Sequence, residues 1–319
     1  MTTANRLSTN RGDDLAAVRA AIATRFVGRE RELDLVLAAV AAGRDLILEG
    51  PPGTSKSTLL RAITAEWGIP LVLVEGNADL TPSRLVGHHN PSRVLKEDYS
   101  ADNFVDGPLL EAMRVGGFLY VEEFNRAPED TIDTLLTAMA ERVITVPRVG
   151  SVVAQPSFRI VASMNPYDNI GTTRLSTSVH DRMCRLVVDY QDAPAEREIV
   201  AQRAQSPAPR IVADAVAVTR ATRERDDIRQ GSSVRGAIDL AMVATQLCTM
   251  RGVAIPDDDA VDPPRNLPTE YTGAFLDAMM IALSGRIHLD DTAFATAEGV
   301  LTEIWQDHFV LRPAAAEPG

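Results

Sequence analysis

The chain has 319 residues, a net charge of −12, and 45% hydrophobic and 24% charged residues. This composition is ordinary for a soluble globular protein of one large or two smaller domains, and its acidity argues against a broad nucleic-acid-binding surface, which needs clustered Lys and Arg. No apolar run reaches the about 20 residues of a membrane span, and no signal-peptide core follows Met1. Cys184 and Cys248 are expected to be free thiols in the core. We therefore expect a cytoplasmic protein.

Two helices are expected before the first strand. Asp13 or Asp14 can cap a helix that runs to about Thr24, and an apolar stripe predicts a second helix over about 30–42. We assign residues 1–22 to an N-terminal helical extension.

The strongest motif of the chain lies in residues 45–58. Asp45 to Glu49 predicts a short buried strand, and Ser57 is expected to open a helix. The small-residue loop and the first helical turn contain Gly50, Pro51, Pro52, Gly53, Thr54, Ser55, Lys56, Ser57 and Thr58. Successive N–H groups and the helix dipole make such a loop an anion site. Lys56 would reach the β- and γ-phosphates of a nucleotide, and the Ser57 hydroxyl would be a ligand of Mg²⁺.

One residue departs from the G-x-x-x-x-G-K-[ST] pattern of this loop, because Ser55 replaces the last glycine. Serine is small, so we expect the loop to close if this position does not require φ > 0. A chance Gly-rich turn before a helix is the alternative interpretation.

The loop between the two amino-terminal helices contains Phe26, Val27 and Gly28. It lies shortly before the phosphate-loop strand, where apolar groups can cover a nucleotide base. Ordinary packing explains Phe26 and Val27 equally well.

After the first motif, Pro70 to Val74 predicts a second buried strand, and residues 77–107 form a long irregular segment. Segments of this length are usually functional or carry a small element of their own. His88 and His89 lie there side by side, without Cys or carboxylate at ligand spacing, so we expect no metal site. A helix is predicted over 108–115.

An acidic pair ends the next predicted strand, Phe118 to Val121. A carboxylate at the carboxyl end of a buried strand lies where parallel α/β sheets bind ligands. Glu122 could hold the hydration shell of Mg²⁺, and Glu123 could polarise the water that attacks the γ-phosphate. Two surface acids at a strand end are the alternative.

Further strands and helices complete an α/β core. A helix is predicted over about 129–140, a β-hairpin over 144–153, and a strand over 158–164 that ends at the polar Asn165. Asn165 would lie beside Glu123 if their strands are parallel neighbours, and its amide could then orient the attacking water. Cys184 to Val188 is the last predicted strand.

The carboxyl-terminal region changes character. From Pro194 onward no convincing strand is seen, and five helices fit the pattern. The sequence therefore predicts an α/β core with a parallel sheet over residues 23–192 and an all-α domain over 193–319.

Several motifs, in this order, resemble the AAA+ ATPases, and in detail the MoxR branch, which includes NorQ-, CbbQ- and GvpN-like proteins. The segments that carry the resemblance are Gly50 to Ser57, Phe118 to Ala127, Ser163 to Pro166, Gly171-Thr172, Asp181-Arg182 and Gly231 to Arg235. The resemblance implies a P-loop αβα core followed by a helical lid domain, and covers roughly residues 24–310.

The resemblance also implies residue roles. Asn165 corresponds to sensor one, and Arg235 to sensor two, which contacts the nucleotide from the lid. Arg182 is similar to the arginine finger that acts on ATP in the neighbouring subunit, with Arg174 as a second candidate. Residues 77–107 and 144–153 match the two inserts of this branch.

Relatives of this kind form hexameric rings, and many act with a partner that contains a von Willebrand factor A domain. The resemblance thus implies an ATP- and Mg²⁺-dependent chaperone that remodels or activates a client complex, such as a metalloenzyme. One alternative is a ring motor acting on nucleic acid. Another is a non-hydrolysing nucleotide switch or scaffold, because Ser55 replaces the loop glycine and Glu122 replaces the aspartate usual in this family.

Overall fold

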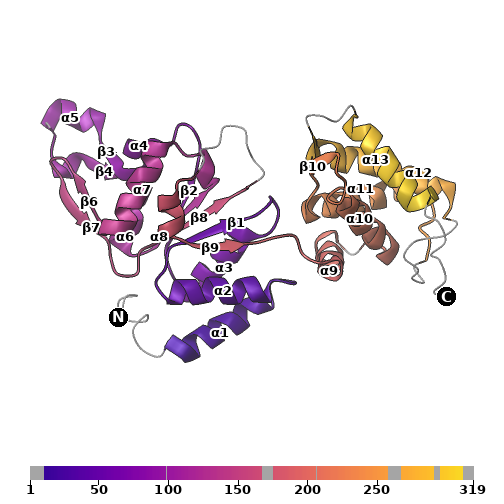
Figure 1. Cartoon of the computed structure of the whole chain (residues 1–319), viewed down its shortest axis with the longest axis horizontal. Coiled ribbons are helices and arrows are strands. Elements are labelled where there is room, and N and C mark those ends of the chain that lie inside the picture. Colours follow the sequence, from indigo (N-terminus) through magenta and orange to yellow (C-terminus); the bar gives the residue numbers. More distant parts are fainter. Residues whose placement is uncertain are drawn as a thin grey trace. The chain divides into compact units, whose positions relative to one another are not determined.

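The computed structural model describes residues 11–97, 99–166, 175–205, 207–257, 267–290 and 295–311. The chain divides into two compact units, Met1–Asp189 and Tyr190–Gly319, and each is described by itself (Figure 1). Within the described ranges, no helix is both long enough and apolar enough to cross a bilayer.

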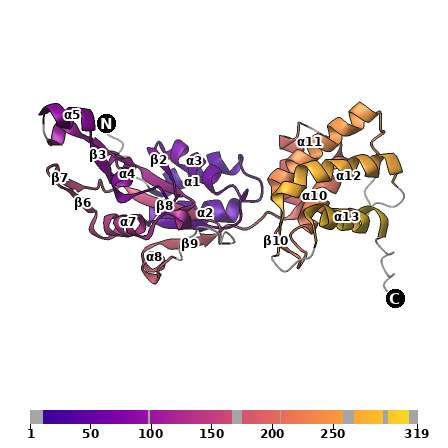
Figure 2. The ribbon, with the colours of Figure 1, turned by 90° about the horizontal axis from the view of Figure 1, so that it is seen from above.

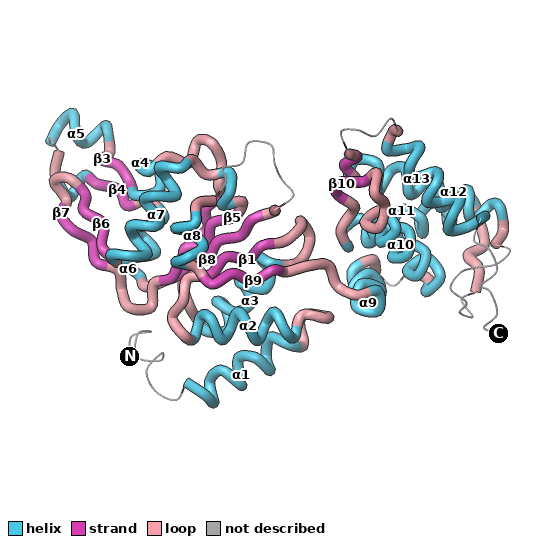
Figure 3. Tube along the Cα trace, viewed as in Figure 1, coloured by secondary structure: helices cyan, strands magenta, loops and turns pink. Residues whose placement is uncertain are grey.

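A five-stranded parallel sheet forms the centre of the first unit, with the order β2-β5-β8-β1-β9 (Figure 3). Its strands are β1 (Leu46–Glu49), β2 (Leu71–Glu75), β5 (Phe118–Glu122), β8 (Arg159–Met164) and β9 (Cys184–Val187). Because all five run in the same direction, their carboxyl ends share one edge of the sheet and their amino ends share the other. The predicted parallel α/β core is confirmed.

Helices cover both faces of this sheet. The face that carries Leu46, Leu48 and Tyr120 packs against the amino-terminal helices and the helix after the first strand. The opposite face, with Ile47, packs against the other helices of the unit. The helices are α1 (Arg11–Ala23), α2 (Glu30–Ala41) and α3 (Lys56–Trp67) on the first face, and α6 (Pro108–Val115), α7 (Glu129–Glu141) and α8 (Thr177–Arg182) on the second.

Three local predictions were wrong. α1 begins at Arg11, so Asp13 and Asp14 lie within its first turn and do not cap it. β2 is an edge strand, and Leu73 is 40% exposed, because only β5 lies beside it. Both cysteines are free, but Cys184 is exposed on the other edge strand, whereas Cys248 is buried as predicted.

The two predicted inserts contain structure of their own and lie side by side at one end of the unit (Figures 1 and 2). The first insert contains α4 (Pro82–Val86), β3 (Gly87–His89), α5 (Pro91–Glu97) and β4 (Phe104–Asp106), and the second is the hairpin of β6 (Val143–Val146) and β7 (Gly150–Val153). The inserts touch each other, since the Arg148 guanidinium lies 5.1 Å from the centre of the Tyr99 ring. The predicted hairpin is confirmed.

The second unit is built mainly from helices. These are α9 (Ala193–Arg203), α10 (Pro209–Ala221), α11 (Val234–Arg251), α12 (Thr269–Leu283) and α13 (Ala297–Gln306). A short ladder of β10 (Ile228–Gln230) and β11 (His288–Leu289) corrects the prediction that this region has no strand. Such short pairs leave almost no alternating pattern to detect.

A buried polar network holds the core of this unit. Asp214 is 1% exposed, and its carboxylate accepts two hydrogen bonds from Arg210, at 2.8 and 2.9 Å, and one from the Tyr271 hydroxyl at 2.8 Å. His308 Nε2 lies 2.9 Å from the same carboxylate. Burial and the Asp214 charge raise the pKa of Tyr271. The network ties α10, α12 and the turn after α13 together.

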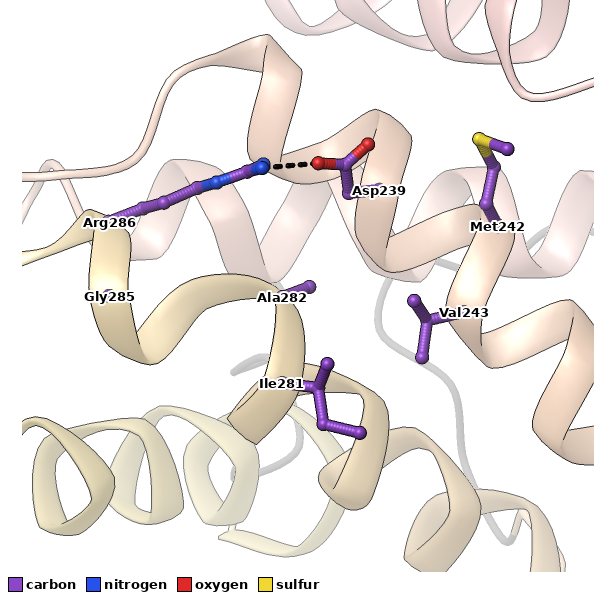
Figure 4. A pocket seen from close by; sticks show the side chains of 7 residues that line it. All are labelled: Asp239, Met242, Val243, Ile281, Ala282, Gly285 and Arg286. Atoms are coloured by element: carbon purple, nitrogen blue, oxygen red, sulfur yellow. Dashed lines mark hydrogen bonds and ion pairs between the residues drawn. The ribbon is translucent and has the colours of Figure 1, made fainter.

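A groove of about 380 Å³ lies on the surface of the second unit (Figure 4). Its lining comes from α11, from the end of α12 and from the 3-10 turn Ser284–Arg286 that follows. Met242 and Ile281 are exposed in it, and an ion pair between Asp239 and Arg286 lies at one end.

Candidate nucleotide site

The phosphate loop connects β1 to α3 at the carboxyl edge of the sheet. The Gly50 N–H donates to the Met164 carbonyl over 3.1 Å, which places the start of the loop beside the end of β8. A Cβ on Gly50 would lie 2.0 Å from the Val188 carbonyl oxygen, so no other residue fits here. The backbone directly after β9 thus fixes the position of the loop.

Ser55 does not meet the condition under which it was expected to replace glycine without cost. It is the N-cap of α3 and has φ 66° and ψ 18°, in the left-handed region that favours glycine. Its side chain makes no capping hydrogen bond. Gly53, two residues earlier, has φ 81°. The loop therefore closes, with backbone strain at Ser55.

Lys56 lies over its own loop. Its Nζ donates to the carbonyls of Gly50 and Pro51, both at 2.8 Å, and lies 3.2 Å from the Thr54 hydroxyl. In this state the Lys56 ammonium group is thus bound to its own loop. Phosphate would compete with the two carbonyls for the ammonium group. The remaining predicted loop residues, Pro52 and Thr58, are exposed.

A chain of three hydroxyl groups lies under the loop. The fully buried Tyr120 hydroxyl donates to Ser163 Oγ over 2.8 Å and lies 3.0 Å from Ser57 Oγ. Since the Tyr120 proton is used toward Ser163, the Ser57 hydroxyl donates to Tyr120. Its lone pairs then remain available to a cation. Burial raises the pKa of Tyr120, so the phenol keeps its proton at neutral pH.

The acidic pair lies at the same edge of the sheet. Glu122 is the last residue of β5, and Glu123 follows it with φ 50°. Glu123 forms an ion pair with Arg126 at 2.9 Å. A Cβ on Gly76 would lie 2.3 Å from the Glu123 carbonyl oxygen, so this glycine admits the turn.

Asn165 lies between the phosphate loop and the acidic pair. It follows β8, which is paired with β1 on one side and with β5 on the other. The Asn125 side chain donates to the Asn165 carbonyl over 3.3 Å and joins this turn to the one after β5. The predicted neighbourhood of the strands that carry Glu123 and Asn165 is confirmed.

The loop before α2 is anchored near the end of β9. Arg29 is 3% exposed and donates to the Asp189 carbonyl over 2.6 Å. Phe26 packs partly buried against the core around α1 to α3, Val27 is half-buried, and Gly28 is exposed with φ 64°. This arrangement accommodates ordinary packing of Phe26 as well as contact with a base.

Three predicted arginines lie away from the phosphate loop or outside the described ranges. Arg182 ends α8, directly before the amino end of β9, and its Nη1 donates to the Ser178 hydroxyl over 2.6 Å and to the Ser178 carbonyl over 3.1 Å. Arg235 is the second residue of α11, in the other unit. Arg174 lies outside the described residues.

The oxygen groups at the loop suit a hard cation. The Ser57 hydroxyl and the Glu122 carboxylate belong to the ligand class that Mg²⁺ prefers, and Mg²⁺ usually keeps several waters and takes few protein ligands. Among the residues that the structure describes, no group of three or more His, Cys, Asp and Glu is placed to hold a metal. By their chemistry, the Ser57 hydroxyl and the Glu122 carboxylate fit a cation that a bound nucleotide would also contact.

Sequence reasoning missed Tyr120, Ser163 and Arg126. A tyrosine and a serine within otherwise aliphatic buried strands were the available signal for the first two. Arg126 follows Glu123 by three residues, but the unusual turn that brings them together is not visible in the pattern.

Comparison with known proteins identifies the core. Residues 45–183 match the family model of the AAA domain, dynein-related subfamily. The chain is 28% identical to the gas vesicle ATPase GvpN of Ancylobacter aquaticus, covering 85% of this chain and 76% of the relative. It is 30% identical to the gas vesicle ATPase GvpN1 of Halobacterium salinarum, covering 67% of this chain and 66% of the relative.

Solved structures share the fold. A crystal structure of a candidate ATPase from Cytophaga hutchinsonii aligns with a TM-score of 0.50 and 20% identity, over 95% of this chain and 96% of that chain. At this identity the likeness concerns the fold alone. Residues 45–183 are therefore an AAA domain, and the chain is an AAA+ ATPase similar to the gas vesicle ATPases GvpN and GvpN1.

Proposed function

We propose that this ATPase is a MoxR-type chaperone, which uses ATP hydrolysis to remodel or activate a partner protein complex. The observation that supports it most is the gathering of the phosphate loop, the acidic pair and Asn165 at one edge of one parallel sheet. Binding groups and groups able to activate water are then within one site.

Each group has a role in this proposal. Lys56 exchanges its loop carbonyls for the β- and γ-phosphates, and Ser57 and Glu122 hold Mg²⁺, which neutralises phosphate charge when bound. Glu123 leaves Arg126 and polarises the attacking water, which Asn165 orients. Phe26, Val27 and Gly28 cover the base, and Arg235 contacts the nucleotide from the lid.

Arg182 acts on a neighbouring copy. It precedes β9 at the amino edge of the sheet, whereas the phosphate loop follows β1 at the carboxyl edge. The intervening strand has four residues, about 13 Å at about 3.3 Å per residue, so Arg182 lies too far from its own loop. AAA+ ATPases commonly form hexameric rings, and a head-to-tail ring supplies such a residue from outside, with Arg174 as a second source.

The partner and the client are the least constrained part of the proposal. The two relatives are gas vesicle ATPases, which favours a protein assembly of that kind as the client. The touching inserts around Tyr99 and Arg148 offer a surface for it. A von Willebrand factor A domain protein is the proposed adaptor. The net charge of −12 argues against nucleic acid as the substrate.

Mixing two inactive variants tests the shared site. Arg182→Ala and Glu123→Gln subunits should each bind ATP, and each alone should hydrolyse it at least about 10²-fold more slowly than the wild type. Equal mixtures should recover activity, because at some interfaces an intact Glu123 meets an intact Arg182 of the next copy. A mixture of Lys56→Ala with Glu123→Gln subunits is the control for unspecific stimulation, because no copy in it has both phosphate binding and Glu123.

Two results would contradict the proposal. Full activity of the Glu123→Gln variant would show that Glu123 does not polarise the attacking water. Absence of rescue, together with activity per subunit that does not change with protein concentration, would place Arg182 outside the reaction.

A further inference from the structure

The turn that begins α11 is held by residues outside the helix. Ser233 is the N-cap of α11, and its side chain makes no capping hydrogen bond. The residue before it, Ser232, is 1% exposed, and both of its backbone groups bond to the segment that follows α10. Its N–H donates to the Thr222 hydroxyl over 2.9 Å, and its carbonyl accepts from Arg223 Nε over 2.6 Å. These bonds fix the start of α11, where Arg235 lies exposed in the first turn.

The backbone also approaches closely at this place. A Cβ on Gly231 would lie 2.5 Å from the Thr222 carbonyl oxygen, so only glycine allows the approach. Close packing and the two hydrogen bonds of Ser232 together give the turn one position relative to the end of α10.

The Arg223 guanidinium is itself held on two further sides. Glu196, in the first turn of α9, is 1% exposed and accepts from Arg223 Nη1 over 2.7 Å and from Arg220 Nη1 over 3.2 Å. The guanidinium carbon of Arg223 lies over the Tyr190 ring, 3.9 Å from its centre. Its Nη2 is buried and makes no hydrogen bond within the described ranges, so the ring face is what stabilises this part of the charge.

We propose that Arg223 is a positioning residue for ATP hydrolysis, which holds Arg235 in place by joining the turn before α11 to Glu196 and Tyr190. A guanidinium suits this role, because its fork donates in several directions while its face stacks on a ring. Tyr190 is the residue at which the second unit begins, so one side chain joins the start of the unit to the start of α11. This inference rests on the proposed contact of Arg235 with the nucleotide, and it names what orients that arginine.

Arg223→Lys is the variant to test, and Arg220→Lys is its matched control. Lysine keeps the positive charge beside Glu196, but it cannot pair with the carboxylate, donate to the Ser232 carbonyl and stack on a ring at once. Arg220 binds the same carboxylate, and its other hydrogen bond in the described part of the chain goes to the Gln191 carbonyl and not to the turn.

The first arm measures the hydrolysis of Mg-ATP by the full chain. Arg223→Lys should lower kcat/KM at least about fivefold, and Arg220→Lys should leave it within about twofold. In an Arg235→Ala background, Arg223→Lys should lower it by less than about twofold, because the group that it positions is gone. Equal thermal midpoints from Trp305 fluorescence, in a Trp67→Phe background, show that the second unit is intact.

A second pair of variants serves if Arg223→Lys melts lower than its control. Tyr190→Leu removes the ring face under the guanidinium, and Tyr190→Phe keeps it. The Leu variant should show the same dependence on Arg235, and the Phe variant should hydrolyse ATP within about twofold of the wild type.

The second arm follows the turn without nucleotide. Amide hydrogen exchange over residues 228–237 should be at least about threefold faster in Arg223→Lys than in Arg220→Lys, because the bond that holds the Ser232 carbonyl is lost. Unchanged exchange would show that Arg223 does not hold the turn and would overturn the inference.

The remaining outcomes separate this inference from the proposed function. A slow Arg235→Ala variant together with an unchanged Arg223→Lys variant would overturn the inference alone. An equal loss from Arg223→Lys with and without Arg235 would do the same, because the role would then be purely structural. A wild-type rate for Arg235→Ala would contradict the proposed role of Arg235, and the inference with it.

Discussion

Replacing Ser55 with glycine should stabilise the first unit. Ser55 has φ 66° at the N-cap of α3 and makes no capping hydrogen bond there. The left-handed backbone conformation destabilises a residue with a Cβ by about 1–2 kcal/mol, and it does not destabilise glycine. Glycine also gives the unfolded chain more freedom, which costs about 0.4–1 kcal/mol. The net gain is about 0.5–1 kcal/mol in the free energy of unfolding.

Such a gain corresponds to a rise of about 1–4 °C in thermal midpoint for a unit of this size. The chain has two tryptophans, Trp67 and Trp305, one in each unit. Trp305→Phe leaves Trp67 as the only reporter, at the end of the same helix that Ser55 begins. Its fluorescence during heating and in urea would follow the first unit alone.

Two matched variants test whether φ is the cause. Ser55→Ala keeps the Cβ and should leave the free energy of unfolding within about 0.5 kcal/mol of the wild type. Gly53→Ser places the same strain at φ 81° and should destabilise by about 1–2 kcal/mol. A Ser55→Gly protein that melts below the wild type, or an Ala variant as stable as the Gly variant, would refute the reasoning.

Three further predictions concern buried polar groups. Tyr120→Phe should cost about 1–3 kcal/mol, because two hydroxyls lose their partner, and should raise the Mg²⁺ concentration needed for half-maximal ATP hydrolysis, measured by titration. Asp214→Asn should cost about 3–5 kcal/mol in urea unfolding followed by Trp305, since it leaves the Arg210 charge buried. Burial raises the pKa of Asp45, so its stabilising contribution is complete below about pH 3.9 and is lost as pH rises through the folded pKa. The unfolding free energy of the wild type minus that of Asp45→Asn should therefore fall from pH 4 to 7.

Control measurements distinguish these effects from a general loss of structure. Nucleotide binding without Mg²⁺ should be the same in Tyr120→Phe and the wild type, and a loss there would indicate a distorted loop. Trp67 fluorescence should report little change for Asp214→Asn, because the substitution lies in the other unit. The Arg19 hydrogen bond lowers the pKa of Asp34, so the Asp34→Asn difference should run opposite to that of Asp45. A pH-independent Asp45 difference would contradict the assignment.

The strands that position the site could be predicted because each apolar strand ends at a polar residue. Apolar runs that stop at Glu122 and at Asn165 mark the carboxyl edge of a parallel sheet without any knowledge of strand order. The pairing of β5 with β8 then confirmed that the two ends are neighbours. Edge position could not be predicted in this way, since β2 is as apolar as a central strand, and its exposure follows only from its place in the order.

The part of the site that the sequence did not predict depends on contacts between distant segments. The left-handed backbone at Glu123 lies in a turn that Gly76 admits, and residue type gave no sign of it. At Ser55 the only sign was that the motif has glycine at this position. The cavity lined by Arg44, Arg142, Arg159 and Arg182 joins distant residues that share no motif. The engagement of Lys56 by its own loop is a property of one state, which a motif cannot describe.

β1 couples the two edges of the sheet mechanically. It is bonded along its whole length to β8 on one side and to β9 on the other. A strand of four residues clamped on both sides has no hinge and can move only together with its neighbours. The phosphate loop at one end of β1 is therefore joined by one short strand to Arg44 at the other end, and a displacement of the whole strand would move both. A displacement of β1 caused by nucleotide would in this way reach the opposite edge of the same sheet.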